Sequence, residues 1–236
     1  MNRTIRIFIS LCTIVLVSLI FISATLGITL DDYKKYKGEG AAYLLHDYTG
    51  ENHFALAIVG IDGVAKHVVI EVFAKSDIAG KGLFQQFVFA FPEDRPVINK
   101  AYIMIDGQSP MTIPATALSK TDNLRIEDFL TKKDDLQSGN YGKKIGTETI
   151  HVPAGATECI HYQHKGDGCV VDFWLSDQVL PIGIVKLKSR GSKQMQNYTL
   201  ELTKVLSGVG QAIDETRVVP LSEEMKQILN IAVKLH

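Results

Sequence analysis

Residues 198–203, YTLELT, alternate an apolar and a polar side chain at every position, and residues 185–188, VKLK, repeat the pattern. Successive side chains of a β-strand point to opposite faces of the sheet, so a period of two places all the apolar residues on one face. These two stretches therefore predict strands of a sheet with one face in the protein core and the other in water.

The segments around these two stretches also have the composition of strands. In the first half of the chain, apolar runs rich in β-branched and aromatic residues alternate with Gly, Asp and Asn turns. Strands are predicted there over residues 40–48, 53–61, 67–74, 83–91 and 101–105. In the second half, residues 165–168 are predicted to join strands 159–164 and 170–175 as a hairpin. Short turns between successive strands favour antiparallel pairing.

The last part of the chain predicts an amphipathic helix. Ser222 is a suitable N-cap, and the residues after it are apolar at helical spacing. The apolar residues of this stripe are Met225, Ile228, Leu229 and Ala232. We expect the stripe to pack against the sheet. Residues 122–136 predict either a short helix or an ordered crossover.

Residues 7–30 form an uncharged apolar run that follows Arg3 and Arg6. At 1.5 Å per residue, a helix of this length crosses about 30 Å of hydrocarbon, and the same features also describe a secretory signal. The sequence leaves both alternatives open: residues 1–30 are a cleaved signal peptide or an uncleaved membrane anchor. We expect residues 31–236 to form a single β-rich domain outside the cytoplasm, in a periplasmic or secreted protein.

The charge balance argues against one class of partner. The chain has 236 residues with 25 Lys and Arg against 26 Asp and Glu, which gives a formal net charge of −1. A protein that binds nucleic acid by neutralising phosphates carries a basic excess, so no nucleic-acid partner is predicted. The membrane, contacted through residues 7–30, is the partner that the sequence indicates.

One group of residues has the composition of a metal or redox site: Cys159, His161, His164 and Cys169. On a strand, Cys159 and His161 point to one face and His164 to the other, so a metal site needs a bulge or a turn to unite them. No metal and no cofactor is predicted.

Cys159 and Cys169 are also the candidate disulfide of an exported protein. With residues 165–168 as the turn, however, Cys169 lies opposite His164, and a direct cross-strand disulfide requires a shift in register. The disulfide and two free thiols therefore stay open as alternatives.

The sequence contains none of the short catalytic motifs such as G-x-S-x-G, H-E-x-x-H or the P-loop, and no catalytic residue is predicted. Two neighbouring predicted strands carry more aromatic side chains than a thin sheet needs. These side chains either line an apolar pocket of a curved sheet or fill an ordinary core. They belong to Phe84, Phe87, Phe89, Phe91 and Tyr102.

Residues 146–189 resemble part of an uncharacterised family of exported bacterial β-rich proteins. The shared pattern has a G-x-E strand, a V-P-A-G turn, a C-x-H-Y strand, a W-x-S strand and a P-x-G-x-V-K turn. It is filled by Gly146, Glu148, Val152, Pro153, Ala154, Gly155, Cys159, His161, Tyr162, Trp174, Ser176, Pro181, Gly183, Val185 and Lys186. Such proteins are similar to the lipoprotein-carrier superfamily (LolA/LolB-like). This resemblance implies a curved antiparallel sheet with helices against its concave side, and an apolar cavity.

Together these observations predict an α+β, β-rich fold: a curved antiparallel sheet or incomplete β-barrel with a C-terminal helix packed against it, preceded by an N-terminal apolar helix. The first functional hypothesis is a non-catalytic extracytoplasmic protein that binds a lipid or another apolar ligand in the half-barrel. The second is a structural or interaction module at the membrane surface with no ligand. The third is a metal- or thiol-dependent enzyme built on Cys159, His161, His164 and Cys169.

Overall fold

The computed structural model describes residues 34, 36–76, 82–90, 97–114, 143–166, 168–180, 183–223 and 225–226. The apolar segment 1–30 and the predicted helix or crossover over 122–136 lie outside these ranges. Within them, no helix has the length and apolar character needed to cross a membrane.

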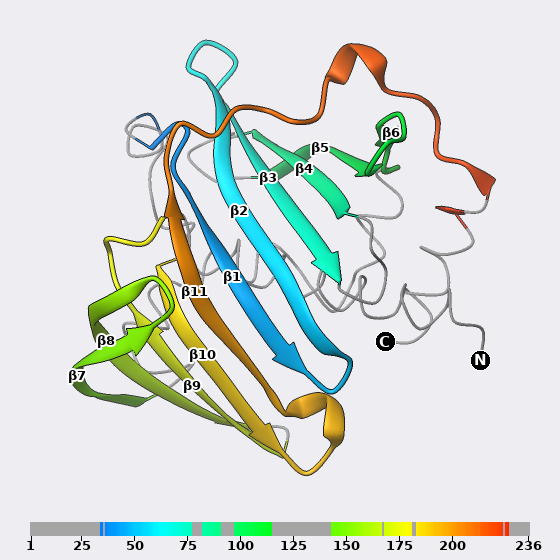
Figure 1. The fold of residues 1–236 in the computed structure, drawn as a ribbon. Helices are drawn as coiled ribbons and strands as arrows, with labels where there is room; N and C mark the ends of the chain where they lie inside the picture. The colour runs from blue at the N-terminus through cyan, green and yellow to red at the C-terminus, as the bar shows by residue number, and fades with distance from the viewer. Residues whose placement is uncertain are drawn as a thin grey trace.

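The described residues form one open antiparallel sheet of eleven strands (Figure 1). The strands are β1 (Gly40–Asp47), β2 (Gly50–Asp62), β3 (His67–Ser76), β4 (Gly82–Ala90), β5 (Val97–Ile105), β6 (Met111–Thr112), β7 (Lys143–Val152), β8 (Gly155–Gly166), β9 (Cys169–Leu175), β10 (Ile184–Gly191) and β11 (Tyr198–Leu206). Two 3-10 helices accompany them, η2 (Gln194–Gln196) and η3 (Glu215–Arg217). The β-rich class and the antiparallel pairing predicted from the sequence are confirmed.

Two meanders make up the sheet, whose order is β6-β5-β4-β3-β2-β1-β11-β10-β9-β8-β7. Within the described residues, the strand ladder that joins the two meanders is the pairing of β1 with β11. It places Tyr43 opposite Leu202. The register shifts between Ala42 and Tyr43, so that Thr203 is passed over. Because a regular ladder would put Thr203 opposite Tyr43, this bulge restores an apolar pair.

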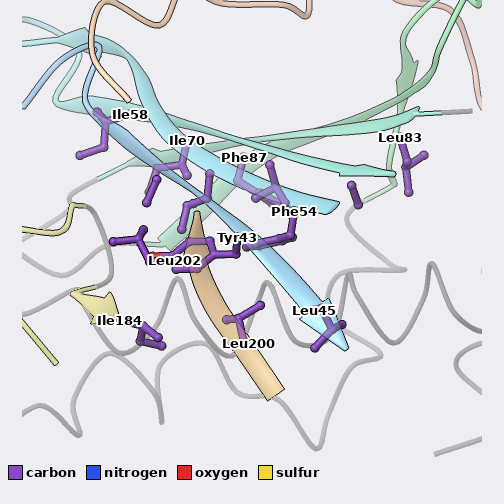
Figure 2. Packing of buried hydrophobic residues seen from close by; sticks show 14 of the residues in the cluster. Tyr43, Leu45, Phe54, Ile58, Ile70, Leu83, Phe87, Ile184, Leu200 and Leu202 are labelled. Carbon is purple, nitrogen blue, oxygen red and sulfur yellow. The ribbon is translucent and has the colours of Figure 1, made fainter. Parts of the chain in front are cut away.

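One face of the sheet is apolar across most of its width, and we call it the apolar face. Residues paired across neighbouring strands share a face, so Phe54 on β2 and Leu202 on β11 lie on this face beside Tyr43. Its other buried side chains include Leu45, Ile58, Ile70, Leu83, Phe87, Ile184 and Leu200 (Figure 2). Burial of each of these large side chains contributes about 1.5–3 kcal/mol to folding.

The hairpin of β8 and β9 is confirmed, but its turn is shorter than predicted. β8 continues to Gly166 and β9 begins at Cys169, and Gly168 in the turn has a φ of 74°. Glycine adopts this left-handed conformation without the strain that a Cβ brings. Cys169 consequently pairs with Gly166, and not with His164 as the four-residue turn predicted.

Residues 207–221, which we call the C-terminal strap, run from the end of β11 towards β6 (Figure 1). The strap packs on the side of β4 and β5 that is opposite the apolar face. There Ile213, which is fully buried, forms a small cluster with Val88 and Tyr102. The strap therefore gives this part of the sheet a second packed layer.

A buried carboxylate holds the strap to the sheet. Glu71 on β3 accepts hydrogen bonds from the backbone N–H groups of Ala212 and Ile213, each at 2.9 Å. The side-chain amide of Gln86 donates to the same carboxylate at 2.9 Å. The strap ends at the border of the sheet, where Val219 forms a parallel bridge with Met111. Polar contacts thus fix the strap at two places.

The predicted C-terminal helix is not supported, because the described residues contain no helix of seven or more residues. Residues 223, 225 and 226 are helical, and the Ser222 hydroxyl accepts the N–H of Met225 at 3.2 Å, as expected of an N-cap. Met225 is buried in the main core cluster. The remaining stripe residues lie outside the described residues: Ile228, Leu229 and Ala232. The described part of the fold is therefore β-rich, and it contains no helix of the predicted length.

The substitution Glu71→Ala tests the anchor of the strap. It leaves two backbone N–H groups and the Gln86 amide without their acceptor, so we expect the free energy of unfolding to fall by about 3 kcal/mol. Amide exchange at Ala212 and Ile213 should become faster at the same time. Glu71→Gln, which retains one carbonyl acceptor, should give a smaller loss. Unchanged exchange at both amides in Glu71→Ala would contradict the anchor.

Candidate functional site

A cluster of polar side chains spans four strands on the face opposite the apolar face. We call it the His161 cluster, and it consists of Glu148 on β7, His161 and Gln163 on β8, Asp172 and Trp174 on β9, and Arg190 on β10. The pairing register brings its members together, because His161 lies opposite Trp174 and Gln163 opposite Asp172. Strand residues two apart share a face, so His161 and Gln163 point to the same side of β8.

His161 lies between two carboxylates. Its Nδ1 is 2.9 Å from Oε1 of Glu148, and its Nε2 is 3.0 Å from Oδ1 of Asp172. The ring stacks on Trp174 with centroids 4.5 Å apart, and the indole N–H of Trp174 donates to Glu148 at 2.7 Å. Both ring nitrogens can donate only when the imidazole carries two protons, so the charged ring satisfies both carboxylates.

Asp172 is the buried centre of the cluster, with its side chain 4% exposed. Its carboxylate accepts hydrogen bonds from the Gln163 amide at 2.8 Å and from the Arg190 guanidinium. Burial acts to raise the pKa of Asp172, but the hydrogen bonds from Gln163, His161 and Arg190 outweigh it and hold that pKa below its ordinary value. The carboxylate is therefore ionised at neutral pH.

This geometry does not assemble a nucleophile and a base. Neither nitrogen of His161 is free to accept a proton from a substrate, since each faces a carboxylate oxygen. The nearby Cys159 thiol is buried, and burial, followed by the charges of Glu148 and Glu158, raises its pKa to about 11. A thiol with such a pKa is protonated at neutral pH and reacts slowly. The contacts of the cluster are those of side chains that hold four strands together. They do not favour acid–base or thiol chemistry.

The predicted metal candidates do not converge. Cys159 and His161 lie on the side of the sheet opposite the apolar face, whereas the pairing register puts His164 and Cys169 on the other side. Among the residues that the structure describes, no three His, Cys, Asp or Glu side chains are arranged to hold a metal ion.

The candidate disulfide between Cys159 and Cys169 is not formed, because both thiols are free. Cys169 pairs with Gly166, whereas Cys159 pairs with Glu148 far along β8. Seven residues of strand separate Cys159 from Gly166, which corresponds to about 23 Å at 3.3 Å per residue. A disulfide needs Cα atoms within about 7 Å, so of the two alternatives that the sequence left open, this register favours two free thiols.

The structure divides the predicted aromatic residues between the two faces of the sheet. Phe87 and Phe89 are buried in the core of the apolar face. Phe84 and Tyr102 lie on the opposite side, where the Tyr102 hydroxyl donates to Glu215 of η3 at 2.9 Å. Phe91 lies outside the described residues. The described members therefore do not form a single wall.

The apolar face contains buried polar groups that no sequence pattern indicated, among them Tyr43 and Asn52, which pairs with Leu45. Tyr43 is 1% exposed and its ring lies 6.0 Å from that of Phe54 (Figure 2), and among the described residues its hydroxyl has no hydrogen-bond partner. Burial raises the pKa of this phenol well above its ordinary value, so the group stays neutral. A buried hydroxyl of this kind is a donor available to an acceptor that the described residues do not supply.

Sequence reasoning missed the centre of the His161 cluster. Asp172 interrupts the apolar strand CVVDFWL at 169–175, and a charge in such a strand is a signal that a buried partner is present. The partners themselves come from three other strands, and no spacing in the sequence connects them. The family pattern contains Glu148, but nothing in that pattern indicates its contact with His161.

No family model and no curated protein matches the sequence. A protein described as exported with a YmcC-like fold, from Bacteroides fragilis, is 14% identical over 72% of this chain and 95% of its own, with a TM-score of 0.37. A protein described as a lipoprotein, from Parabacteroides distasonis, is 11% identical over 72% and 95%, with a TM-score of 0.35. MucB in the Pseudomonas aeruginosa MucA/MucB complex is 10% identical over 80% and 58%, with a TM-score of 0.38. TM-scores this low assign neither a fold family nor a function.

The lowered pKa of Asp172 predicts an acid-dependent loss of stability. The ionised carboxylate stabilises the folded state above its unfolded pKa, near 3.8, and that contribution is lost as the pH falls through the lower folded pKa. Asp172→Asn should therefore lower the free energy of unfolding by about 2 kcal/mol at pH 7. Urea titrations from pH 7 to 2.5 should show this difference shrinking below about pH 4. A constant difference over this range would contradict the assignment.

The two described cysteines predict a specific pattern of thiol reactivity. With a pKa near 11, Cys159 is roughly 0.1% thiolate at pH 8, so alkylation of the native protein should modify Cys169 well before Cys159. Peptide mapping after timed treatment with iodoacetamide measures both rates. Unfolding in urea should make the two rates similar. Detection of a Cys159–Cys169 cystine in the peptide map would instead show that the disulfide forms.

Proposed function

We propose that this chain is a non-catalytic module that acts outside the cytoplasm and binds a lipid or another apolar molecule on the apolar face of its sheet. The apolar run 7–30 supports export, since a basic start followed by such a run describes a signal or an anchor. The observation that carries the ligand is the unpaired Tyr43 hydroxyl within this face. The proposal assigns no bond-making step to the His161 cluster.

The energetics of Tyr43 support a ligand with an oxygen acceptor. A buried hydroxyl without a partner costs about 1–3 kcal/mol relative to a satisfied one. An apolar molecule with a carbonyl or carboxyl oxygen would pair with this hydroxyl, while its hydrocarbon part would lie against neighbouring side chains such as Phe54 and Leu202. One precisely placed polar group in apolar surroundings is the usual composition of a small-molecule site.

Of the aromatic residues predicted to line the pocket, Phe87 and Phe89 remain in this proposal because they share the apolar face with Tyr43. Since Tyr43 is almost completely buried, a ligand reaches it only by displacing neighbouring groups. We therefore expect slow association and a change in hydrogen exchange on the central strands when ligand binds.

The alternative is a structural or interaction module at the membrane surface that holds no ligand. One observation favours it: Phe84 and Tyr102 are packed beneath the C-terminal strap and leave no aromatic surface there for a ligand. On this alternative, the buried Tyr43 hydroxyl lowers the free energy of unfolding and serves no ligand. The two functions predict different behaviour of the same substitution.

The substitution Tyr43→Phe distinguishes them. Removing this buried hydroxyl should raise the free energy of unfolding of the ligand-free protein by about 1 kcal/mol, because no described residue forms a hydrogen bond with it. If the hydroxyl serves a ligand, the same variant should bind a fluorescent fatty acid at least fivefold more weakly. Urea denaturation and a fluorescence titration measure the two effects.

Tyr102→Phe is the matched control, since it removes a hydroxyl that is paired with Glu215 on the opposite face. It should lower stability by about 1 kcal/mol and leave fatty-acid binding unchanged. The ligand proposal fails if solvent extraction of the purified protein releases no amphiphile and the wild-type protein binds no fatty acid. Equal binding by wild type and Tyr43→Phe would remove Tyr43 from the site.

A further inference from the structure

The two outer strands of the sheet, β6 and β7, differ in whether another described segment pairs with their outer edge. At the β6 border, the N–H of Thr112 donates to the carbonyl of Val219 at 3.2 Å, and the N–H of Val219 donates to the carbonyl of Pro110 at 2.8 Å. The C-terminal strap therefore occupies that edge. At the β7 border, no described residue pairs with the outer edge of the strand (Figure 1).

β7 is long and exposed enough to accept another strand. It has ten residues, of which all but Gly146, Ile150 and Val152 are exposed. The features that hinder pairing of this edge with another strand lie at the start of β7, where Lys143 and Lys144 precede a bulge next to Gly146. From residue 147 to residue 151 the strand pairs with β8 in regular register and contains neither lysine nor proline. An unpaired edge of this kind is a template for strand addition.

The His161 cluster holds this edge in place. Glu148, in the middle of β7, is bound by His161 and by Trp174. At the end of the β7–β8 hairpin, the N–H of Ala154 donates to the carbonyl of Leu202 on β11 at 3.1 Å. The strand is therefore fixed at its centre and near its end. An edge that is ordered in advance loses less conformational entropy when a partner binds.

Charge indicates which partner fits. Lys143 and Lys144 are exposed, and so is Lys165, which lies two residues beyond Gln163, the partner of Lys143. Among the described residues, none of these three lysines takes part in an ion pair. A partner strand with acidic residues at this end would find complementary charge, whereas a basic one would be repelled.

We propose that the edge of β7 docks an extended peptide segment of a partner protein, with acidic residues beside Lys143 and Lys144. The segment adds antiparallel to residues 147–151 as a further strand of the sheet. Backbone hydrogen bonds supply the affinity and the lysines select acidic ends. This inference does not depend on the ligand proposed for the apolar face, because it uses neither Tyr43 nor that face.

The test uses the full chain and a synthetic peptide, Thr-Val-Thr-Val-Thr-Gly-Glu-Glu, with a fluorescent label. Thr and Val favour the extended conformation, and the two Glu residues reach the lysines in an antiparallel arrangement. We expect saturable binding by anisotropy that weakens with added salt, together with slower amide exchange confined to β7. An analogue with Lys in place of both Glu should bind at least tenfold more weakly. An analogue with alternate amides N-methylated should not bind.

Two double variants separate local charge from net charge. Lys143→Glu with Lys144→Glu should weaken binding of the acidic peptide at least tenfold and strengthen binding of the lysine analogue. The matched control, Lys66→Glu with Lys75→Glu, changes the same number of charges at exposed sites at and before β3, which is far from β7 in the strand order, and should bind as wild type does.

Three results would overturn the proposal. The first is absence of binding at millimolar peptide. The second is a binding result that does not involve β7: either the β7 amides are not protected from exchange, or both double variants weaken peptide binding equally. The third is a dimer of the free protein that the Lys143→Glu and Lys144→Glu changes disrupt, since a second copy would then occupy the edge. Each of these leaves the fatty-acid result of Tyr43→Phe unaffected, so the two proposals fail independently.

Discussion

The pairing of β1 with β11 is the constraint on which the rest of the sheet depends. These strands lie more than 150 residues apart in sequence, and their ladder merges two local meanders into one sheet. The bulge that passes over Thr203 keeps Leu202 opposite Tyr43, so the apolar face continues across the junction. Without that one-residue correction, a polar side chain would face Tyr43 at the centre of the core.

The side opposite the apolar face contains the polar contacts that hold the sheet's periphery. On one half, the buried carboxylate of the His161 cluster ties β8, β9 and β10 together, and Glu148 adds β7 through His161. On the other half, a second buried carboxylate, Glu71, fixes the C-terminal strap. In both places the buried charge is matched by several donors, which is the condition under which a carboxylate is tolerated out of water. Both buried carboxylates therefore stabilise the fold, and the proposed functions use other surfaces of the sheet.

Those surfaces are of two kinds. Among the described residues, the Tyr43 hydroxyl on the apolar face has no hydrogen-bond partner, and the outer edge of β7 has no pairing strand beside its lysines. The contrast with the β6 border is informative, because there the chain covers its own edge with Val219. Within the described part of the chain, one edge is covered and the other is held in place without being paired, and the docking proposal offers a physical reason for this difference.

The sequence by itself determined the strands and which of their residues share a face, because alternation in stretches such as YTLELT at 198–203 is local. Only the tertiary structure decided which residues meet. A turn two residues shorter than predicted moved Cys169 away from His164, and contacts such as His161 with Asp172 or Glu71 with the strap join distant segments. Register depends on turns, bulges and long-range pairing, and a period of two contains no information about any of these.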